Sequence, residues 1–287
     1  MQITATYKLA HDNGSEVTFR ASPNTSGSYS PGRPKILVMH YTAGSTTAGD
    51  ISHLCNPAAT GKPSAHLVIG RDGKITQLVS FNVVANHAGA GTYKGAGNMN
   101  GRSIGIELSN AGLLRRVGTQ WKNDIGVVVA ASKVAEAKHK YDGKDSGWET
   151  FPAVQMSAAV AAASAICAKY GITDICGHDD FAAYRGKRDP GPLFPMADFT
   201  AKVQGDEEGA ASSSGLMQVW ADTGLNLRKE PAAAGAKVDR TPNPLPKGTK
   251  VRILQQSGEW VLVHVIDSNG NETDMGWCFG PYLEKAS

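Results

Sequence analysis

The sequence contains no apolar run that approaches the roughly 18 residues needed to cross a bilayer. It also lacks a strong charge of either sign, since 29 Lys and Arg face 26 Asp and Glu, which leaves a formal net charge of +3. Proteins that bind nucleic acids usually carry a dense basic stripe, and this sequence has none. We therefore expect no membrane insertion and no nucleic-acid partner. The mild positive charge is compatible with weak attraction to an anionic surface.

Cysteine is also scarce, and the four cysteines have none of the spacings typical of metal sites. Cys167 and Cys176 could in principle meet in a disulfide, but buried free thiols are the favoured interpretation. The first residues lack the charged and then apolar pattern of a secretory signal. We expect either synthesis in the cytoplasm or a signal that was trimmed away.

The composition that is present is that of a folded protein, with 41% hydrophobic and 19% charged residues. A length of 287 residues suffices for one large core and a smaller module. Residues 201–215 are small, polar and low in complexity, which predicts a linker. The expected organisation is therefore a first domain at 1–200 and a second at 216–287.

The pattern of the first domain predicts the α/β class, with a mixed central β-sheet flanked by helices. The continuous apolar run at 35–44 predicts a strand buried on both faces, with His40 where the strand emerges. Residues 110–150 are harder to place, with a possible strand at 127–129 and a short helix at 133–141. Further strands are expected at 64–70, 75–79, 103–108 and 172–176, and helices at 46–56 and 152–170.

The second domain has a different texture. Short apolar stretches alternate with turns rich in Gly, Pro and Asn, which predicts a small all-β barrel of about 70 residues. Trp220, Trp260 and Tyr282 could form a binding face or the core of this module, and the core is favoured for Trp260. The expected strands lie at 225–228, 250–254, 260–265 and 276–278.

The residues most suggestive of chemistry lie in the turn-rich segment 176–192, which carries His178, Lys187 and Asp189. His and Asp are both zinc ligands, and His40 is the obvious third donor from a distant part of the chain. A lone His after a strand is more often a packed or surface residue than a ligand. Two imidazoles and one carboxylate, however, leave a fourth position for water, as in catalytic zinc sites. This set predicts one catalytic Zn²⁺ ion in an amide hydrolase.

An amide hydrolase also needs a base that moves a proton from water to the leaving nitrogen. Glu107 is the candidate because it stands among apolar neighbours in a strand, although an outward-facing carboxylate is the alternative. Lys187 could stabilise the oxyanion of the tetrahedral intermediate. On its own features, Lys187 is better explained as a solvated residue beside Arg185 and Arg188.

The other histidines give weaker signals. His66 alternates with apolar residues in a strand and could face solvent or the core, whereas His87 lies in a Gly-rich loop suited to contact with a substrate. The remaining histidines have no convergent partners in the sequence and stay unassigned: His11, His53, His139 and His264.

Six motifs occur together in one order, and they resemble the zinc-dependent N-acetylmuramoyl-L-alanine amidases, the type-2 amidase and peptidoglycan-recognition-protein family. The resemblance covers roughly residues 30 to 200. Two departures stand out, namely the loop between His178 and Asp189 and the length of residues 110–150. The motifs are VMHYTA (38–43), SAHLVI (64–69), NHAG (86–89), SIGIEL (103–108), GHDD (177–180) and KRDPGP (187–192).

The resemblance implies a role for each matching position. His40, His178 and Asp189 correspond to the zinc ligands, Glu107 to the catalytic acid and base, and Lys187 to the oxyanion-stabilising residue. The positions that line the substrate groove would be His66, His87 and Asn98. The implied reaction cleaves the amide between N-acetylmuramic acid and the L-alanine of the stem peptide.

The second domain resembles bacterial SH3-like domains, which often bind cell-wall peptides. Together the two resemblances imply a peptidoglycan hydrolase that acts on the cell wall and takes peptidoglycan or muropeptides as its partner. A phage lysin released at lysis fits this picture, and so does a toxin aimed at rival cells. The alternative is a peptidoglycan recognition protein that binds without turnover.

Overall fold

The computed structural model describes residues 1–205, 216–257, 259–268 and 270–286. The chain divides into two compact units, Met1–Met196 and Ala197–Ser287, and each is treated by itself. Helix α4 (Met196–Gln204) makes residues 201–204 of the expected linker helical. The rest of that linker, apart from Gly205, lies outside the described residues. No helix in the described ranges is both long and apolar enough to cross a membrane.

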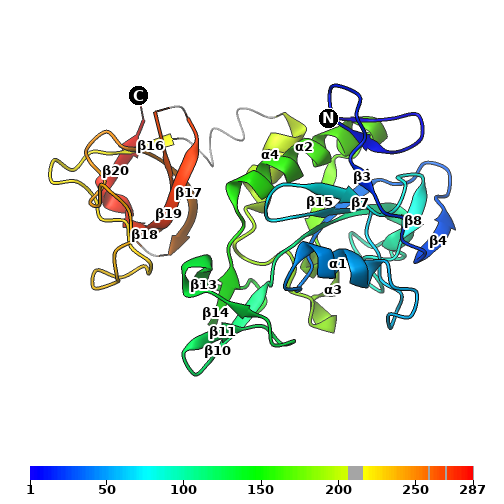
Figure 1. Cartoon of the computed structure of the whole chain (residues 1–287), viewed down its shortest axis with the longest axis horizontal. Coiled ribbons are helices and arrows are strands. Elements are labelled where there is room, and N and C mark those ends of the chain that lie inside the picture. The colour runs from blue at the N-terminus through cyan, green and yellow to red at the C-terminus, as the bar shows by residue number, and fades with distance from the viewer. Residues whose placement is uncertain (206–215, 258, 269, 287) are drawn as a thin grey trace. The chain divides into compact units, whose positions relative to one another are not determined.

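A six-stranded mixed sheet forms the centre of the first unit (Figure 1). All neighbouring strands in it are parallel except β6 and β7, which pair antiparallel as a hairpin around the Asp72-Gly73 turn. The expected α/β class is thereby confirmed. In spatial order the strands are β15 (Asp174–Gly177), β5 (Ile36–Tyr41), β9 (Ser103–Leu108), β6 (Leu67–Ile69), β7 (Ile75–Gln77) and β3 (Thr18–Phe19).

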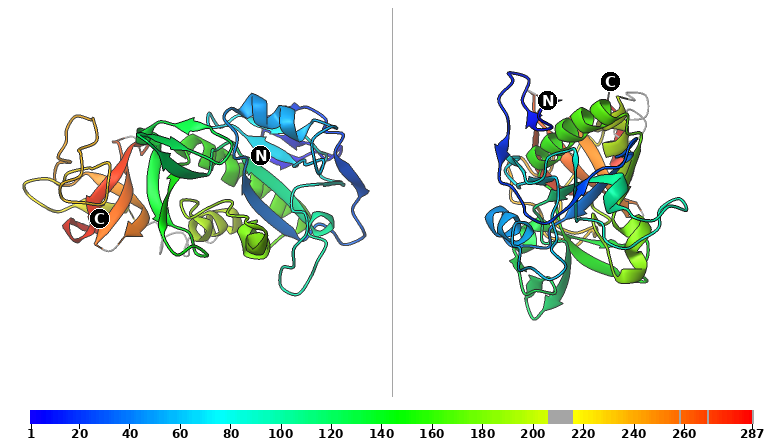
Figure 2. Two further views of the ribbon diagram at one scale, coloured as in Figure 1. Left: turned by 90° about the horizontal axis from the view of Figure 1, so that it is seen from below. Right: turned by 90° about the vertical axis from the view of Figure 1, so that its right-hand side faces the viewer.

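Helices cover both faces of this sheet. Helix α2 (Ala153–Tyr170) lies on one side, and α1 (Thr47–Leu54) and α3 (Asp179–Ala182) lie on the other (Figures 1 and 2). Helix α1 begins because the Thr46 hydroxyl accepts from the Gly49 N–H, and α2 ends because Gly171 adopts the left-handed conformation. Both helices confirm the predictions at 46–56 and 152–170.

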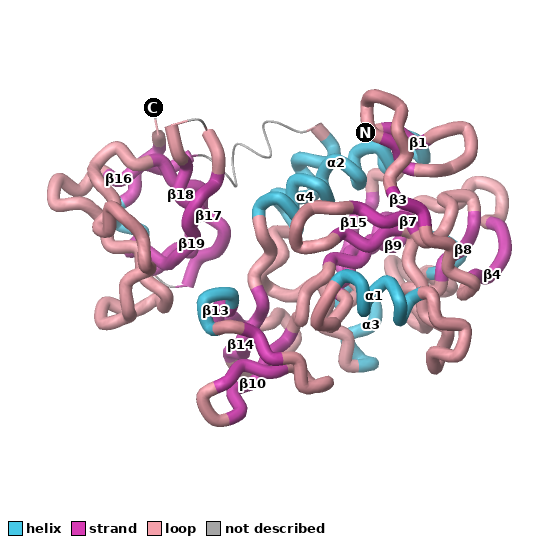
Figure 3. The backbone as a smooth tube through the Cα atoms, viewed as in Figure 1, coloured by secondary structure: helices cyan, strands magenta, loops and turns pink. Residues whose placement is uncertain are grey.

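A second, five-stranded antiparallel sheet spans residues 113–149, and we call it the insertion sheet (Figure 3). The predicted short helix at 133–141 is wrong, because a strand runs through it. Ala135, Ala137 and His139 are buried and alternate with exposed residues, which is the period of a strand. In spatial order the strands are β12 (Val128–Val129), β11 (Gln120–Lys122), β10 (Leu113–Val117), β14 (Asp145–Glu149) and β13 (Val134–Lys138). The helix propensity of Ala and Lys gave way to pairing with β14.

Two small two-stranded sheets and four 3-10 turns complete the described elements. One sheet joins β1 (Gln2–Ile3) to β2 (Leu9–Ala10), and the other joins β4 (Thr25–Ser28) to β8 (Val83–Ala85). The turns are η1 (Asn100–Arg102), η2 (Ala131–Lys133), η3 (Ala183–Arg185) and η4 (Gly280–Tyr282). All four cysteines are free, and Cys55 is the one that is not fully buried.

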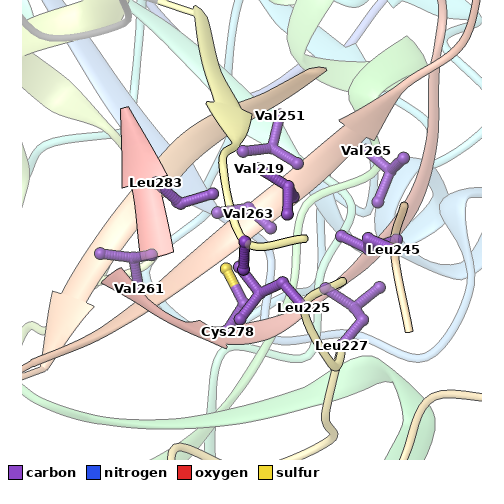
Figure 4. Close-up of a cluster of buried hydrophobic side chains, with 11 residues drawn as sticks. Val219, Leu225, Leu227, Leu245, Val251, Val261, Val263, Val265, Cys278 and Leu283 are labelled. Atoms are coloured by element: carbon purple, nitrogen blue, oxygen red, sulfur yellow. The ribbon is translucent and has the colours of Figure 1, made fainter. Parts of the chain in front are cut away.

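The second unit is all-β, as expected, and is built on one five-stranded antiparallel sheet. Its core is aliphatic and draws on residues from Val219 to Leu283 (Figure 4). Trp260 is not part of this core, in contrast to the prediction, and lies half-buried beside Phe279. In spatial order the strands are β19 (Glu272–Phe279), β18 (Trp260–Ile266), β17 (Lys250–Ser257), β16 (Leu216–Val219) and β20 (Leu283–Lys285).

Candidate functional site

Parallel pairing of β5 with β9 brings two of the predicted residues together. The register aligns His40 with Glu107, and side chains aligned across a sheet point to the same face. That face is the one covered by α1 and α3, because Val38 packs with Phe181 of α3. His40 and Glu107 therefore stand side by side near the carboxyl ends of their strands.

The last strand supplies the other half of the site. β15 pairs in parallel with β5, so the residue that follows it, His178, reaches the level of His40. The main-chain N–H of Asp179 then donates to the carbonyl of Asp189 (2.9 Å), which ties the returning chain to the same place. His40, His178 and Asp189, distant in sequence, thus meet in one buried cluster.

We call His40, His178 and Asp189 the donor triangle. Oδ2 of Asp189 lies 2.8 Å from Nδ1 of His40 and 2.9 Å from Nδ1 of His178, and the two Nδ1 atoms are 3.1 Å apart. A tetrahedral ion with ligand bonds of about 2.0–2.1 Å needs donors about 3.3 Å apart. The triangle therefore fits a metal ion after a small expansion. Its two imidazoles and one carboxylate are ligands that such an ion takes.

Outer contacts orient both imidazoles of the triangle. Nε2 of His40 lies 2.9 Å from Nδ1 of His87, and Nε2 of His178 donates to the carbonyl of Ala88 (2.9 Å). The ring of His87 has room because a Cβ at Gly105 would stand 2.4 Å from its Cγ. Metal-ligating histidines characteristically engage their second nitrogen in this way. His87, expected in a loop that contacts a substrate, instead lies against the outward nitrogen of His40.

Burial keeps the rings of His40 and His87 neutral, and a neutral imidazole is the form that binds a metal. It lowers the pKa of His40 to about 4 and that of His87 well below its usual value. Burial by itself would raise the pKa of the Asp189 carboxyl. The two histidine partners, His178 and His40, outweigh burial and lower that pKa far below its usual range. The triangle thus holds the neutral imidazole of His40 beside the ionised carboxylate of Asp189.

Glu107 differs from a solvated carboxylate. The residue is half-buried, and its Oε2 is fully buried without a hydrogen-bond partner among the described residues. Burial raises the pKa of the Glu107 carboxyl well above its usual value, the charge of Asp189 adds to this, and the ammonium of Lys187 opposes it. Lys187 itself is exposed, yet its charge acts on both Glu107 and His40.

His66 and Asn98 do not join the site. His66 is fully buried, and its Nδ1 accepts from the Gly105 N–H (3.1 Å) while its Nε2 lies 3.0 Å from the Val83 carbonyl. Both ring nitrogens are thus engaged in the core, and the predicted contact of His66 with substrate stays a prediction. Asn98 is exposed in the turn before η1, where its Oδ1 accepts from the Gly101 N–H (3.4 Å).

Asn100 and Ser103 support the site and were missed. Oδ1 of Asn100 accepts main-chain N–H groups of three successive residues, His87, Ala88 and Gly89, at 3.1, 2.7 and 3.3 Å. Oγ of Ser103 lies 3.3 Å from Nε2 of His87. The sequence could have indicated both residues, because an Asn and a Ser at the start of a buried strand are suited to hydrogen-bond a neighbouring loop.

Comparison with known proteins bears on this arrangement. A family model described as N-acetylmuramoyl-L-alanine amidase matches residues 30–192, more than half of the chain. The chain belongs to this family. A model described as bacterial SH3 domain matches residues 223–284, within the second unit.

Curated relatives include two amidases from Escherichia coli (strain K12). The N-acetylmuramoyl-L-alanine amidase AmiD is 34% identical over 177 residues, which cover 57% of this chain and 51% of AmiD. The 1,6-anhydro-N-acetylmuramyl-L-alanine amidase AmpD is 32% identical over 154 residues, or 54% of this chain and 62% of AmpD. The chain thus spans between half and two thirds of these relatives. Among solved structures, a selenomethionine AmpD derivative covers 65% of this chain and 93% of its own, with 25% identity and a TM-score of 0.45.

The buried imidazole of His66 leads to a prediction about stability and pH. Its pKa is lowered from 6.5 to about 4 by burial, so the unfolded chain binds this proton more readily than the folded one. The contribution of His66 to the free energy of unfolding should therefore fall as the pH drops from 6.5 to 4. The loss approaches about 3 kcal/mol at the end of that range.

Denaturant unfolding of the metal-free protein at pH 7.5 and pH 4.5 checks this expectation. His66→Gln cannot titrate, so it should be less stable than the wild type at pH 7.5 yet lose less stability on acidification. The exposed His11, replaced by Gln, is the control and should follow the wild type. Equal losses for the wild type and His66→Gln would show that His66 is not held neutral.

Proposed function

We propose that the protein is a zinc-dependent peptidoglycan amidase, which cleaves the amide between N-acetylmuramic acid and the L-alanine of the stem peptide. The observation that carries the proposal is the donor triangle with Glu107 in register beside it. Family membership supports this reaction, and the names of AmiD and AmpD point to muramyl-L-alanine bonds. AmpD is named for anhydro-muramyl substrates, so an anhydro-muropeptide is a suitable first compound to test.

In this proposal His40, His178 and Asp189 hold the zinc ion. When bound, zinc supplies a Lewis acid that makes water nucleophilic near neutral pH. The reaction adds the oxygen of water to the lactyl carbonyl carbon, breaks the C–N bond, and yields a carboxylic acid and a free L-alanine amine. The chain's own residues must orient the carbonyl and move one proton from water to the departing nitrogen.

Glu107 suits this proton transfer. Its carboxyl has a raised pKa and one oxygen without a partner among the described residues, so it can both accept the proton of water and release it to nitrogen. Lys187 suits the second task, because its ammonium already acts on Glu107 and would offset negative charge that develops on the carbonyl oxygen.

Mass spectrometry of peptidoglycan incubated with the protein tests the function and its metal together. We expect free stem peptides with an L-alanine amino terminus, lost with a zinc chelator and restored by added zinc. His178→Ala should neither bind zinc nor cleave, because the triangle loses a donor. Cleavage that persists unchanged in chelator would contradict the zinc requirement. Binding to sacculi without any cleavage would favour the alternative, a recognition protein without turnover.

Glu107→Gln should retain zinc but lose turnover, because an amide cannot accept and return the proton. The expected loss in kcat is about 100- to 10,000-fold, the usual contribution of a positioned acid or base. Kinetics on a purified muropeptide and zinc analysis of the same sample measure both properties. Glu136→Gln, on the exposed face of β13, is the control. Full activity of Glu107→Gln would remove Glu107 from the mechanism.

We also infer that the second unit binds the cell wall, as its match to bacterial SH3 domains suggests. A row of rings extends from its aliphatic core, against which Phe279 packs. In this row Trp220, Tyr282, Phe279 and Trp260 follow one another with ring centroids 5.8, 5.7 and 5.4 Å apart. Trp220 and Tyr282 are 44% and 43% exposed, so the row reaches the surface. Such rings offer apolar faces with polar edges, a common feature of binding surfaces.

Cosedimentation with purified sacculi tests this inference. Trp220→Ala with Tyr282→Ala should lower the bound fraction, and deletion of residues 206–287 should lower it at least as much. Lys247→Ala is the control, because it removes only an exposed ion pair with Asp222. Adsorption that survives the deletion would assign wall binding to the first unit instead.

A further inference from the structure

The insertion sheet meets the segment that carries two members of the donor triangle. The turn that leaves β13 contributes His139, and its Nε2 lies 2.8 Å from Oδ2 of Asp179, the residue next to His178. Nζ of Lys140 lies 3.1 Å from Oδ1 of the same carboxylate. Both His139 and Asp179 are almost completely buried, at 1% and 3% exposure. Asp179 is therefore held on both oxygens from the insertion sheet.

The position of Asp179 matters because its main chain links the two ends of the ligand segment. Its N–H donates to the carbonyl of Asp189, and its neighbour His178 donates from Nε2 to the loop after β8. A shift of Asp179 would therefore change the spacing between His178 and Asp189. Among the described residues, the hydrogen bonds of its side chain go to His139 and Lys140, so its influence on the triangle passes through the backbone.

The hydrogen-bonding state of His139 follows from its neighbours. Nδ1 accepts from the main-chain N–H of Tyr141 (3.3 Å), so the proton resides on Nε2 and is donated to Asp179. The imidazole also stacks on Trp148 of β14, with ring centroids 5.6 Å apart and planes 25° apart. The indole N–H donates to the Ala137 carbonyl (2.9 Å), which holds Trp148 within the sheet.

Two further contacts join the same elements. The face of Trp148 lies against Gly191, where a Cβ would come within 2.9 Å of the indole. The guanidinium of Arg188 pairs with Asp142, with Nε 3.0 Å from each carboxylate oxygen. The ligand segment from His178 to Gly191 is thus held by the insertion sheet at its start, near its end and through the residue before Asp189.

We propose that the insertion sheet braces the metal-binding segment and that His139 is a positioning residue for it. The inference rests on the zinc site of the proposed function. His139 touches neither the metal ligands nor the substrate; it keeps Asp179, and through it the spacing of His178 and Asp189, ready for the ion. Outer residues that orient metal ligands typically change metal affinity by about 10- to 100-fold when they are replaced.

His139→Phe isolates the hydrogen bond, because phenylalanine retains a ring to stack on Trp148 and lacks the donor. We expect the zinc dissociation constant of the full-length chain, measured by competition with a chromogenic chelator, to rise roughly 10- to 100-fold. His139→Gln, which returns an N–H donor to the same region, should recover most of the affinity. Arg115→Gln is the control, since it breaks only an exposed ion pair with Asp124 in the same sheet.

Melting of the metal-free proteins separates positioning from general stability. A zinc dissociation constant of His139→Phe equal to that of the wild type, with a lower melting temperature, would overturn the proposal and leave His139 a purely structural residue. If His139→Phe does not fold, Asp142→Asn replaces it, and unchanged zinc affinity there would equally overturn the brace.

The same data distinguish this proposal from the proposed function. A wild type that binds zinc but releases no stem peptide would refute the amidase and leave the brace intact. A wild type that cleaves, together with a fully zinc-competent His139→Phe, would refute the brace alone. A wild type that binds no zinc would overturn both.

Discussion

The close approach of His40, His178 and Asp189 is the constraint on which the rest of the first unit depends. Three buried polar groups within about 3 Å of one another are unfavourable unless each finds a partner. The structure meets this condition because the ionised carboxylate of Asp189 lies within hydrogen-bond distance of the neutral His40 ring and of the His178 ring. The outward nitrogen of each imidazole also has a partner of its own, His87 for His40 and the Ala88 carbonyl for His178. The glycine at 105 belongs to this solution, because only its missing side chain leaves space for His87.

The two halves of the site differ in how firmly the local structure holds them. His40 and Glu107 are carried by neighbouring strands in mid-sheet, where continuous pairing on both sides fixes their positions. His178 and Asp189 belong to a segment of one short helix, a 3-10 turn and loops. Such a segment needs tertiary contacts to hold its shape. The ion pairs and stacked rings of the insertion sheet supply these tertiary contacts. In this way residues 110–150 support the segment that carries His178 and Asp189.

The second unit keeps two of its large aromatic rings outside its core. Its aliphatic core, from Val219 to Leu283, includes neither Trp220 nor Tyr282, whereas Trp277 is fully buried. Trp220 and Tyr282 remain at the surface. Exposed rings carry a cost in solubility, and their association in one row makes this surface a candidate for binding.

The sequence was enough to indicate the α/β class, the strands around His40 and Glu107, the helix at 152–170, and the three residues that meet in the donor triangle. These follow from local rules, since apolar runs, caps and ligand types are properties of a few neighbouring residues. The insertion sheet, the burial of His66, and the position of His87 behind His40 were decided only by the tertiary structure. Strand pairing overrode the helix propensity around Ala135, and contacts with Gly105 placed the rings of His66 and His87. Such contacts join residues far apart in the chain, and no local pattern encodes them.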